Sequence, residues 1–297
     1  MENWIRSASL IASLAVWLFV ASAFGAPQKH EVTGILLASD PGQHTITVSC
    51  KEIPGYMDAM VMSFRVKDAK LPDGLQPGAN LAFTLFVDQG TSFAEGVHVV
   101  PFESFELDPT EAHRLKLLEN AAHARPPSDS ALRVGAPVPD FRLSDQKRQM
   151  VSLSQFHGKV VALTFVYTRC PLPDYCTRLA NNFAILQRRL KSRMGRDLIL
   201  LTIVIDPVHD QPDALGTYAN TWKADARYWH FLTGQVAEIQ QVCRHFDMAF
   251  YPDEAVFVHS FHTVVIDRKQ HLAANLEGNS FTAQQLGDLV QSVMGRQ

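Results

Sequence analysis

The sequence predicts two domains, a small all-β barrel followed by an α/β domain with a single mixed sheet. Three observations predict this arrangement. The chain has 297 residues, of which 46% are hydrophobic and 19% charged, and this suffices for two folded domains of ordinary size. Short strand patterns fill the first third of the chain. Strand and helix patterns alternate after Val134.

The first domain is expected over residues 30–105, where short apolar runs alternate with turn residues. Strands are predicted at Val32–Leu37, Thr45–Cys50, Phe64–Val66 and Leu81–Val87. Several short strands at such close spacing are typical of a small antiparallel barrel. Residues 106–133 then form a predicted linker, with a short helix expected at Ala112–Ala122.

The second domain is expected over residues 134–297. Its central strand is Val160–Tyr167, because a continuous apolar run is typical of a strand that is buried on both faces. Further strands are predicted at Leu198–Ile205, Thr263–Asp267 and Leu272–Leu276. The spacing of apolar residues predicts helices at Leu179–Leu190, Leu215–Trp222, Val236–Phe246 and Leu286–Val293. The last two strands form a hairpin, so the sheet is expected to be mixed.

The N-terminal residues 1–25 are predicted to be a signal peptide. Arg6 precedes the apolar stretch Ala8–Val20, and small residues follow it. The stretch is shorter than the ~20 residues that a membrane-spanning helix needs, so cleavage after Ala23 or Gly25 is expected. An uncleaved anchor is the alternative, and it is the only arrangement in which membrane contact is expected.

The charge of the chain argues against one class of partner. The formal charge is -3, and no long run of Lys or Arg is present. The sequence therefore has no electrostatic signature of binding to the phosphates of nucleic acid.

Two of the four cysteines stand where α/β sheets place their functional sites. Cys170 and Cys176 follow the predicted central strand and precede a helix, whose dipole is expected to lower a thiol pKa. Pro171 and Pro173 keep the segment out of helix, so a loop can bring the two sulfurs together. Such a pair binds a soft metal or cycles through a disulfide, and a plain structural disulfide is the alternative.

The other sulfur-bearing and imidazole residues extend this pattern. His259 can add an imidazole to the two thiolates, a ligand set suited to either oxidation state of copper, and His262 is the alternative. Cys243 lies in a predicted helix, where a buried thiol is expected. Asp206 and Asp210 are expected either to cap and support loops or to lie behind the cysteine pair.

The predicted barrel contains a cluster of methionines. Three of the eight methionines, Met57, Met60 and Met62, fall within six residues. On a strand, Met60 and Met62 project to the same face, with Met57 just outside it. Thioether sulfur is a soft, neutral ligand that suits Cu(I). The alternative is that these methionines only fill the barrel core.

The second domain resembles the Sco/SenC family along nearly its whole length, from Val134 to Gln297. The matching segments are Gly135–Phe141, the cysteine loop, Asp206–Pro212, Trp229–Gly234 and His259-Ser260 before Val265–Asp267. The resemblance implies a thioredoxin-like fold with copper bound by Cys170, Cys176 and His259. It also implies a role in assembling the copper centre of cytochrome c oxidase. The usual family loop has three residues between its cysteines, and this loop has five, as in similar-looking bacterial relatives. The longer loop can change metal affinity or favour dithiol redox work.

The first domain resembles the periplasmic CusF-like copper-binding proteins, which are small OB-like barrels. Met60, Met62 and Phe64 match their Met-x-Met-x-Phe strand. Cys50 stands at the place of their histidine ligand, and Met57 stands where some members have a tryptophan that covers the metal. Cysteine also ligates Cu(I), so the resemblance implies a Cu(I) site at Met60 and Met62 with Cys50 as the candidate third ligand.

Together these patterns predict a periplasmic copper metallochaperone that binds Cu(I), Cu(II) or both. Its expected partner is a copper-receiving protein such as a subunit of cytochrome c oxidase. The alternative is a thiol:disulfide oxidoreductase that uses Cys170 and Cys176, with His259 tuning the thiolate. A peroxidase is a third reading, and its motif fits only when the spacing is stretched.

Overall fold

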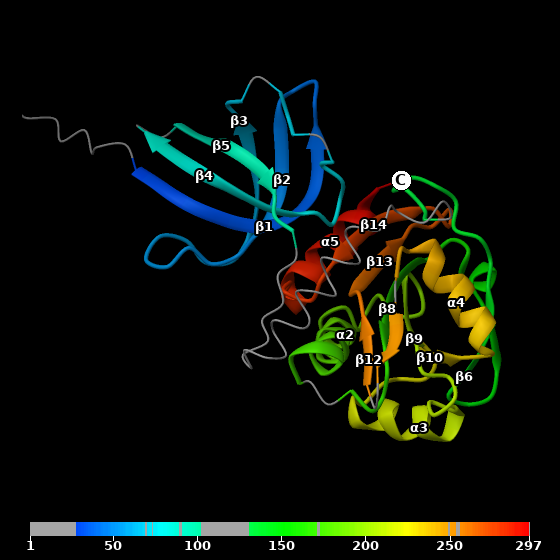
Figure 1. The fold of residues 1–297 in the computed structure, drawn as a ribbon. Coiled ribbons are helices and arrows are strands. Elements are labelled where there is room, and N and C mark those ends of the chain that lie inside the picture. Colours follow the sequence, from blue (N-terminus) through cyan, green and yellow to red (C-terminus); the bar gives the residue numbers. More distant parts are fainter. Residues whose placement is uncertain are drawn as a thin grey trace, which may run out of the picture.

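The structure is a computed structural model. It describes residues 28–68, 70–72, 74–88, 91–101, 131–170, 173–248, 250–253 and 256–296. The predicted signal peptide, the helix expected at Ala112–Ala122 and most of the predicted linker lie outside these residues. The expected order of a β-barrel followed by an α/β domain is confirmed (Figure 1). Among the described residues, no helix has both the length and the apolar character needed to cross a membrane.

The first domain is a closed five-stranded barrel with the strand order β1-β2-β3-β5-β4. Its strands are β1 (Gln28–Asp40), β2 (Thr45–Cys50), β3 (Val61–Val66), β4 (Asn80–Asp88) and β5 (Thr91–Val99). All pairs are antiparallel except β3 with β5, which is parallel. Alternate side chains of the strands point inward, and Phe64 and Phe83 meet edge to face in the core.

The second domain has a seven-stranded mixed sheet with helices on both sides. Its sheet strands are β6 (Arg142–Asp145), β7 (Met150–Ser152), β8 (Val160–Val166), β9 (Leu198–Val204), β10 (Trp229–Thr233), β13 (His262–Ile266) and β14 (Leu272–Glu277). A separate hairpin pairs β11 (Phe250–Asp253) with β12 (Val256–His259). The helices are η1 (Leu153–Phe156), η2 (Pro173–Thr177), α2 (Arg178–Arg189), α3 (Pro212–Thr221), α4 (Val236–His245) and α5 (Ala283–Gly295).

The sheet has the order β14-β13-β8-β9-β10-β6-β7. Every residue of β8 and β9 is buried, as their unbroken apolar sequences predict. The strands β8, β9 and β10 run parallel, and β13 runs antiparallel to β8. The cysteine loop follows the carboxyl end of β8, so it lies where the central strands of the sheet end.

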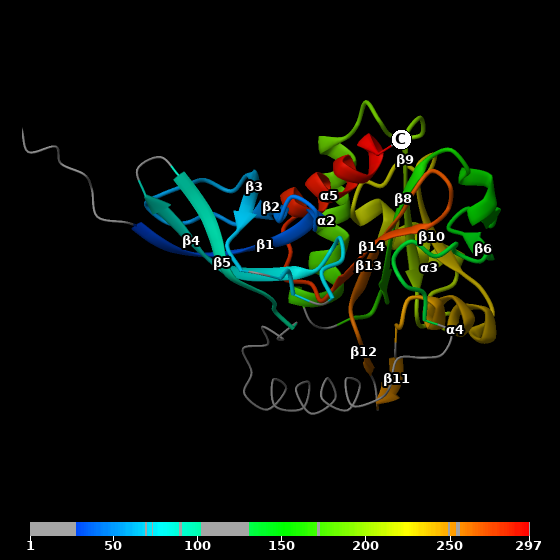
Figure 2. The same ribbon diagram turned by 90° about the horizontal axis from the view of Figure 1, so that it is seen from above.

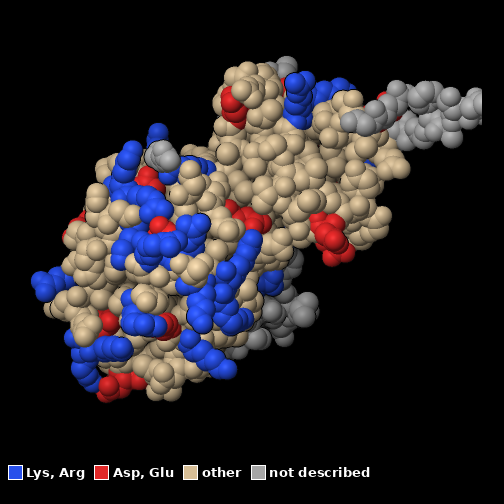
Figure 3. All heavy atoms as spheres, turned by 180° about the vertical axis from the view of Figure 1, so that it is seen from behind, with Lys and Arg blue, Asp and Glu red and all other residues tan. Residues whose placement is uncertain are grey.

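Helices α2 and α5 lie on the side of the sheet that faces the barrel, and α4 lies on the other side (Figures 1 and 2). The barrel strands β1 and β2 pack on α5. Ile35 and Leu37 of β1 are buried in the same apolar cluster as the core of the second domain. Basic side chains gather on the second domain, whereas the visible face of the barrel carries fewer (Figure 3).

Candidate metal sites

The cysteine loop begins at the end of the buried strand β8 and runs into α2. Cys176 lies in η2, a single π-helical turn that Pro173 begins. The Cys176 thiol is hydrogen-bonded to Cys170, so the two sulfurs lie close together. Cys170 is half-buried, and Cys176 is 1% exposed. All four cysteines of the chain are present as thiols.

Burial dominates the chemistry of Cys176. It raises the pKa of this thiol well above its ordinary value of 9.0, and the hydrogen bond and charge of Cys170 raise it further. A hydrogen bond to the backbone of Tyr167 acts in the opposite direction but is weaker. The expectation that the helix dipole would lower the thiol pKa is therefore wrong for Cys176, because desolvation outweighs it. A metal that binds this sulfur must displace a proton.

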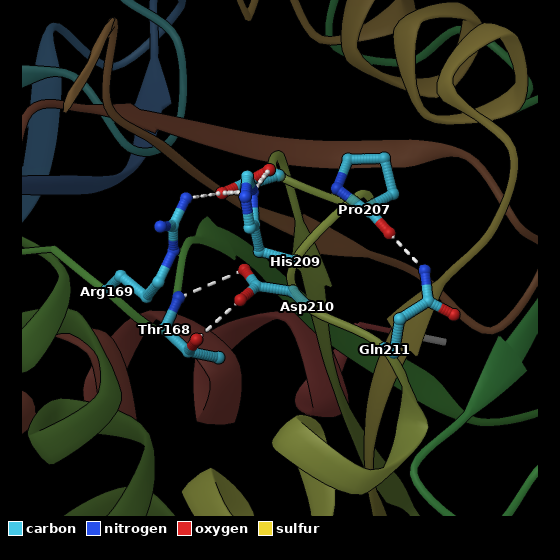
Figure 4. Close-up of polar contacts among 7 residues, drawn as sticks. Thr168, Arg169, Pro207, His209, Asp210 and Gln211 are labelled. Carbon is cyan, nitrogen blue, oxygen red and sulfur yellow. Dashed lines mark hydrogen bonds and ion pairs between the residues drawn. The ribbon is translucent and has the colours of Figure 1, made fainter. Parts of the chain in front are cut away.

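A buried carboxylate anchors the approach to the cysteine pair. Asp210 is fully buried, and it accepts hydrogen bonds from the backbone N–H of Thr168, at 3.0 Å, and from the Thr168 hydroxyl (Figure 4). Burial raises the pKa of Asp210, and the two bonds from Thr168 partly offset that rise. Since Thr168 lies two residues before Cys170, Asp210 fixes the start of the loop.

A second carboxylate holds the residue next to Cys170. Asp206 accepts hydrogen bonds from Arg169 at 2.7 Å and from Nδ1 of His209 at 2.9 Å (Figure 4). Burial raises the pKa of Asp206, but these two hydrogen bonds outweigh it, and the net pKa is lowered. Gln211, rather than Asp210, precedes the first turn of α3. Of the two expected roles, the structure therefore shows these carboxylates supporting the cysteine loop.

Tyr218 also lies near the cysteine pair. The sequence predicted only that it lies in a helix, and not that it is close to this site. Burial raises its pKa above the ordinary value of 10.0, and the charges of Cys176 and Cys170 contribute. Its ring packs edge to face against Trp222, with ring centroids 6.0 Å apart. No spacing in the sequence signals this contact, because α3 reaches the cysteines only through the fold of the sheet.

The two candidate histidines occupy different positions. His259 ends β12, and its backbone pairs with Phe250; its side chain lies outside the described part of the structure. His262 begins β13, is buried, and places Nδ1 3.0 Å from Oδ1 of Asn275. One ring nitrogen of His262 is therefore already engaged. Among the described side chains, no group of three or more His, Cys, Asp and Glu is arranged to hold a metal.

The barrel brings Cys50 and the methionine pair to one face of neighbouring strands. Val48 of β2 pairs with Met62 of β3, and Ser49 pairs with Val61. The same register places Cys50 opposite Met60, and the Cys50 N–H donates to the Met60 carbonyl at 2.9 Å. Side chains opposite each other in an antiparallel pair share a face. The three sulfur-bearing side chains therefore line one edge of the barrel.

Exposure differs sharply among these sulfurs. Met60 is 46% exposed at the rim, whereas Met62 and Met57 are half-buried against the barrel core. Cys50 is buried, its sulfur lies 3.8 Å from the Val48 carbonyl oxygen, and burial raises its pKa to about 12. The site therefore offers two thioethers that need no deprotonation and one thiol that does.

Sequence comparison assigns each domain to a family. The sequence model of SCO1/SenC matches residues 131–295, which is more than half of the chain. The chain belongs to the SCO1/SenC family. The model of the copper binding periplasmic protein CusF matches residues 29–95, which form the barrel.

Individual relatives of this SCO1/SenC protein match one part of it. A Stutzerimonas stutzeri protein named for copper binding is 29% identical over 115 residues, which are 39% of this chain and 54% of that protein. An SCO2-like protein of Rickettsia typhi is 26% identical over 137 residues, 43% of this chain and 64% of that protein. The chain thus spans between about half and two-thirds of the length of these relatives.

The fold of the second domain recurs in a crystal structure from Aquifex aeolicus. The TM-score is 0.50 at 19% identity, and the match covers 55% of this chain and 96% of that one. At this identity the likeness shows the fold alone.

Proposed function

We propose that this protein is a periplasmic copper metallochaperone with one copper site in each domain. Cys170 and Cys176, with His259 as third ligand, bind copper in the second domain. Met60 and Met62, with Cys50, bind Cu(I) in the barrel. The observation that carries this proposal is the hydrogen-bonded pair of thiols at the end of β8 in a domain of the SCO1/SenC family.

The ligand chemistry supports copper over the other metals of a periplasm. Thiolate and thioether sulfurs are soft ligands that favour Cu(I), and hard cations prefer carboxylate and carbonyl oxygens. The two carboxylates near the cysteine pair, Asp206 and Asp210, are already engaged with Thr168, Arg169 and His209. They position the loop and leave the sulfurs to bind the metal.

The family match supports a destination for the copper. We assign the recipient as a copper-receiving subunit of cytochrome c oxidase. The match of the barrel to a periplasmic protein and the predicted signal peptide support an exported location. Cleavage of that peptide releases the protein from the membrane, and an uncleaved segment keeps it anchored.

Copper stoichiometry on the reduced mature protein tests the proposal. Wild type is expected to bind two Cu(I) per chain. Cys170→Ala/Cys176→Ala and Met60→Leu/Met62→Leu are each expected to bind one. Met150→Leu, which changes an exposed methionine of β7, is the matched control and is expected to retain both. If the cysteine variant still binds two Cu(I), the second domain does not hold copper through these cysteines, and that part of the proposal is wrong.

One observation also favours a second function, that of a thiol:disulfide oxidoreductase. Cys170 and Cys176 are close enough to hydrogen bond, so they can form a disulfide while a substrate disulfide is reduced to two thiols. The raised pKa of Cys176 disfavours it as the attacking thiolate, which leaves Cys170 in that role. Insulin reduction by the copper-free protein tests this function. Turnover that disappears in Cys170→Ala would support it.

A further inference from the structure

Buried polar contacts hold the barrel against the second domain. A barrel joined to it only by a flexible linker would not form them. Ser49 of β2 faces away from the barrel core, yet it is 1% exposed. Its hydroxyl donates to Asp288 of α5 at 2.8 Å, and its carbonyl accepts from Gln285 at 2.9 Å. Asp288 also accepts from Arg189 of α2 at 2.6 Å. One buried network therefore joins the barrel to both helices on that side of the sheet.

Backbone contacts extend the interface on both sides of this network. Arg296 donates to the carbonyl of Leu37, and Asn80 donates to the carbonyl of Glu277. Gly78 approaches β14 so closely that a Cβ atom there would lie 2.6 Å from the carbonyl oxygen of Asn275. Its φ of +97° is one that glycine adopts readily. Together with the burial of Ile35 and Leu37, these contacts describe a fixed, built interface.

This docking brings residues next to the barrel sulfurs close to the first turns of α5 and α2. Gln284 of α5 donates to the carbonyl of Ala59, the residue before Met60, at 2.9 Å. Lys51 follows Cys50 just after the end of β2, and burial and the charge of Arg178 lower its pKa; Arg178 lies two residues after Cys176. The segments that carry the two sulfur sites therefore meet at the same junction between the domains.

A surface hollow lies at that junction, lined by residues next to the cysteine pair. It has a volume of about 680 Å³ and lies between the first turns of α2 and α5. Gln284 lines one side, and Thr177 and Trp222 line the other. Thr177 follows Cys176 directly, and Trp222 packs on Tyr218, which lies beside both cysteines. The hollow thus connects the neighbours of Met60 with the neighbours of Cys176.

We propose that Cu(I) passes from the barrel directly to the cysteine pair of the same chain across this docked interface. The inference rests on the proposed function, since it needs both copper sites. In the transfer, the bonds from copper to Met60, Met62 and Cys50 break, and bonds to the sulfurs of Cys170 and Cys176 form. Copper remains Cu(I), and no electron is exchanged. The two thiols of the receiving pair each lose a proton, one of which restores the Cys50 thiol while the other goes to water.

Undocking the barrel without altering either site tests the transfer. Ser49→Arg places a long cation where the Ser49 hydroxyl is buried against α5. Thr47→Arg is the matched control, because Thr47 lies two residues away on the same face of β2, and its hydroxyl is hydrogen-bonded to exposed Ser63. Reduced full chains are mixed with one equivalent of Cu(I) held by a chelator. Ultraviolet Cu(I)–thiolate absorption then reports the arrival of copper at the cysteine pair, after subtraction of the signal of Cys170→Ala/Cys176→Ala chains, in which only the barrel site binds.

Wild type and Thr47→Arg are expected to load the pair at the same rate. Ser49→Arg is expected to load it about tenfold more slowly, because the undocked barrel remains tethered and keeps a high effective concentration. Mixing Cys170→Ala/Cys176→Ala chains with Met60→Leu/Met62→Leu chains should give a slower reaction whose rate depends on protein concentration. If Ser49→Arg misfolds, Gln284→Ala/Arg296→Ala removes two interface hydrogen bonds without added bulk and is expected to slow loading in the same way.

Two results would overturn the inference. One is loading of the cysteine pair at the wild-type rate in the undocked variant. The other is small-angle scattering that shows separated domains in wild type. In both cases a stoichiometry of two Cu(I) per chain would leave the proposed function standing, whereas a stoichiometry below two in wild type would contradict the proposed function itself.

Discussion

The two sulfur sites of this chain are built in opposite ways. In the barrel, the proposed ligands lie on or next to paired strands, so the register of β2 against β3 sets their spacing. In the second domain, both cysteines come from one loop, whose shape depends on a π-helical turn and on Asp210. The barrel site is partly open, with Met60 at the rim, whereas Cys176 is closed off.

This difference indicates a difference in role. In the proposed barrel site, the neutral thioethers of Met60 and Met62 can bind Cu(I) without releasing protons, and only Cys50 must lose one. Buried thiols bind copper only after they lose protons, and the resulting thiolates hold it more tightly. The comparison therefore favours capture in the barrel and retention at the cysteine pair.

The largest effect is expected from Asp210→Ala. This change removes the carboxylate that holds the cysteine loop and leaves the barrel site unchanged. The change leaves the N–H and hydroxyl of Thr168 without their buried acceptor, and it should lower the free energy of unfolding by about 2–4 kcal/mol. Copper affinity at the cysteine pair should fall by about 10–100-fold, the usual effect of losing a residue that orients ligands.

Chelator competition and urea unfolding measure these two quantities. Asp213→Ala is the control, because the Asp213 carboxylate is exposed and accepts hydrogen bonds from Arg148 on the surface. Copper affinity in Asp210→Ala equal to that of the control would show that the loop keeps its shape without the carboxylate.

Met62→Leu is expected to separate ligation from packing in the barrel. Leucine has a similar volume, so the free energy of unfolding should change by less than about 1.5 kcal/mol. Cu(I) affinity of the barrel should nevertheless fall by at least about tenfold, because a copper–sulfur bond is lost. Thermal unfolding and chelator titration of the Cys170→Ala/Cys176→Ala background report the two effects. Unchanged Cu(I) affinity would show that Met62 packs in the barrel core and does not bind copper.

An effect on stability alone is expected from Cys243, the buried thiol that belongs to neither site. Burial raises its pKa to about 12, from an ordinary 9.0. Below pH 9 both the folded and the unfolded state hold the proton; above pH 9 only the unfolded state releases it. Stability should therefore fall as pH rises toward 12, by up to about 1.4 kcal/mol per pH unit for this thiol.

Urea unfolding of copper-free Cys243→Ala between pH 8 and pH 10.5 should show a correspondingly shallower loss of stability. Val242→Ala, a neighbouring buried change in α4, should lower stability without altering the pH slope. If the free energy of unfolding of Cys243→Ala falls with pH as steeply as that of wild type, the Cys243 thiol already ionises in the folded protein.

The sequence predicted most of the fold, because its patterns are local. The apolar runs of β8 and β9 and the helical spacing of α2 and α5 can be read without tertiary context. Strand β5 was missed, since polar residues and Gly96 interrupt its alternation. The strands β6, β7, β10, β11 and β12 of the second domain were not predicted either. The parallel pairing of β3 with β5 was also outside the antiparallel expectation.

The site was predicted less completely, because its support is not local. Pro171 and Pro173 were expected to keep this segment out of helix, but the structure begins a π-helical turn at Pro173, and this turn contains Cys176. The bond from Thr168 to Asp210 joins residues 42 positions apart, and no pattern along the chain reveals it. Docking through Ser49 and Asp288 spans 239 positions, so the sequence shows two domains but not their junction.

The pH dependence of Cu(I) affinity at each site tests the contrast between them most directly. It is measured by chelator competition on the reduced protein. Met60→Leu/Met62→Leu isolates the cysteine pair, and Cys170→Ala/Cys176→Ala isolates the barrel. Affinity at the cysteine pair should weaken about 100-fold for each unit by which the pH falls, because two thiol protons compete with copper. Affinity at the barrel should weaken only about tenfold, for the single proton of Cys50. Equal pH slopes at the two sites, or a flat profile at the cysteine pair, would contradict the assignment of Cys170 and Cys176 as the copper-binding thiolates.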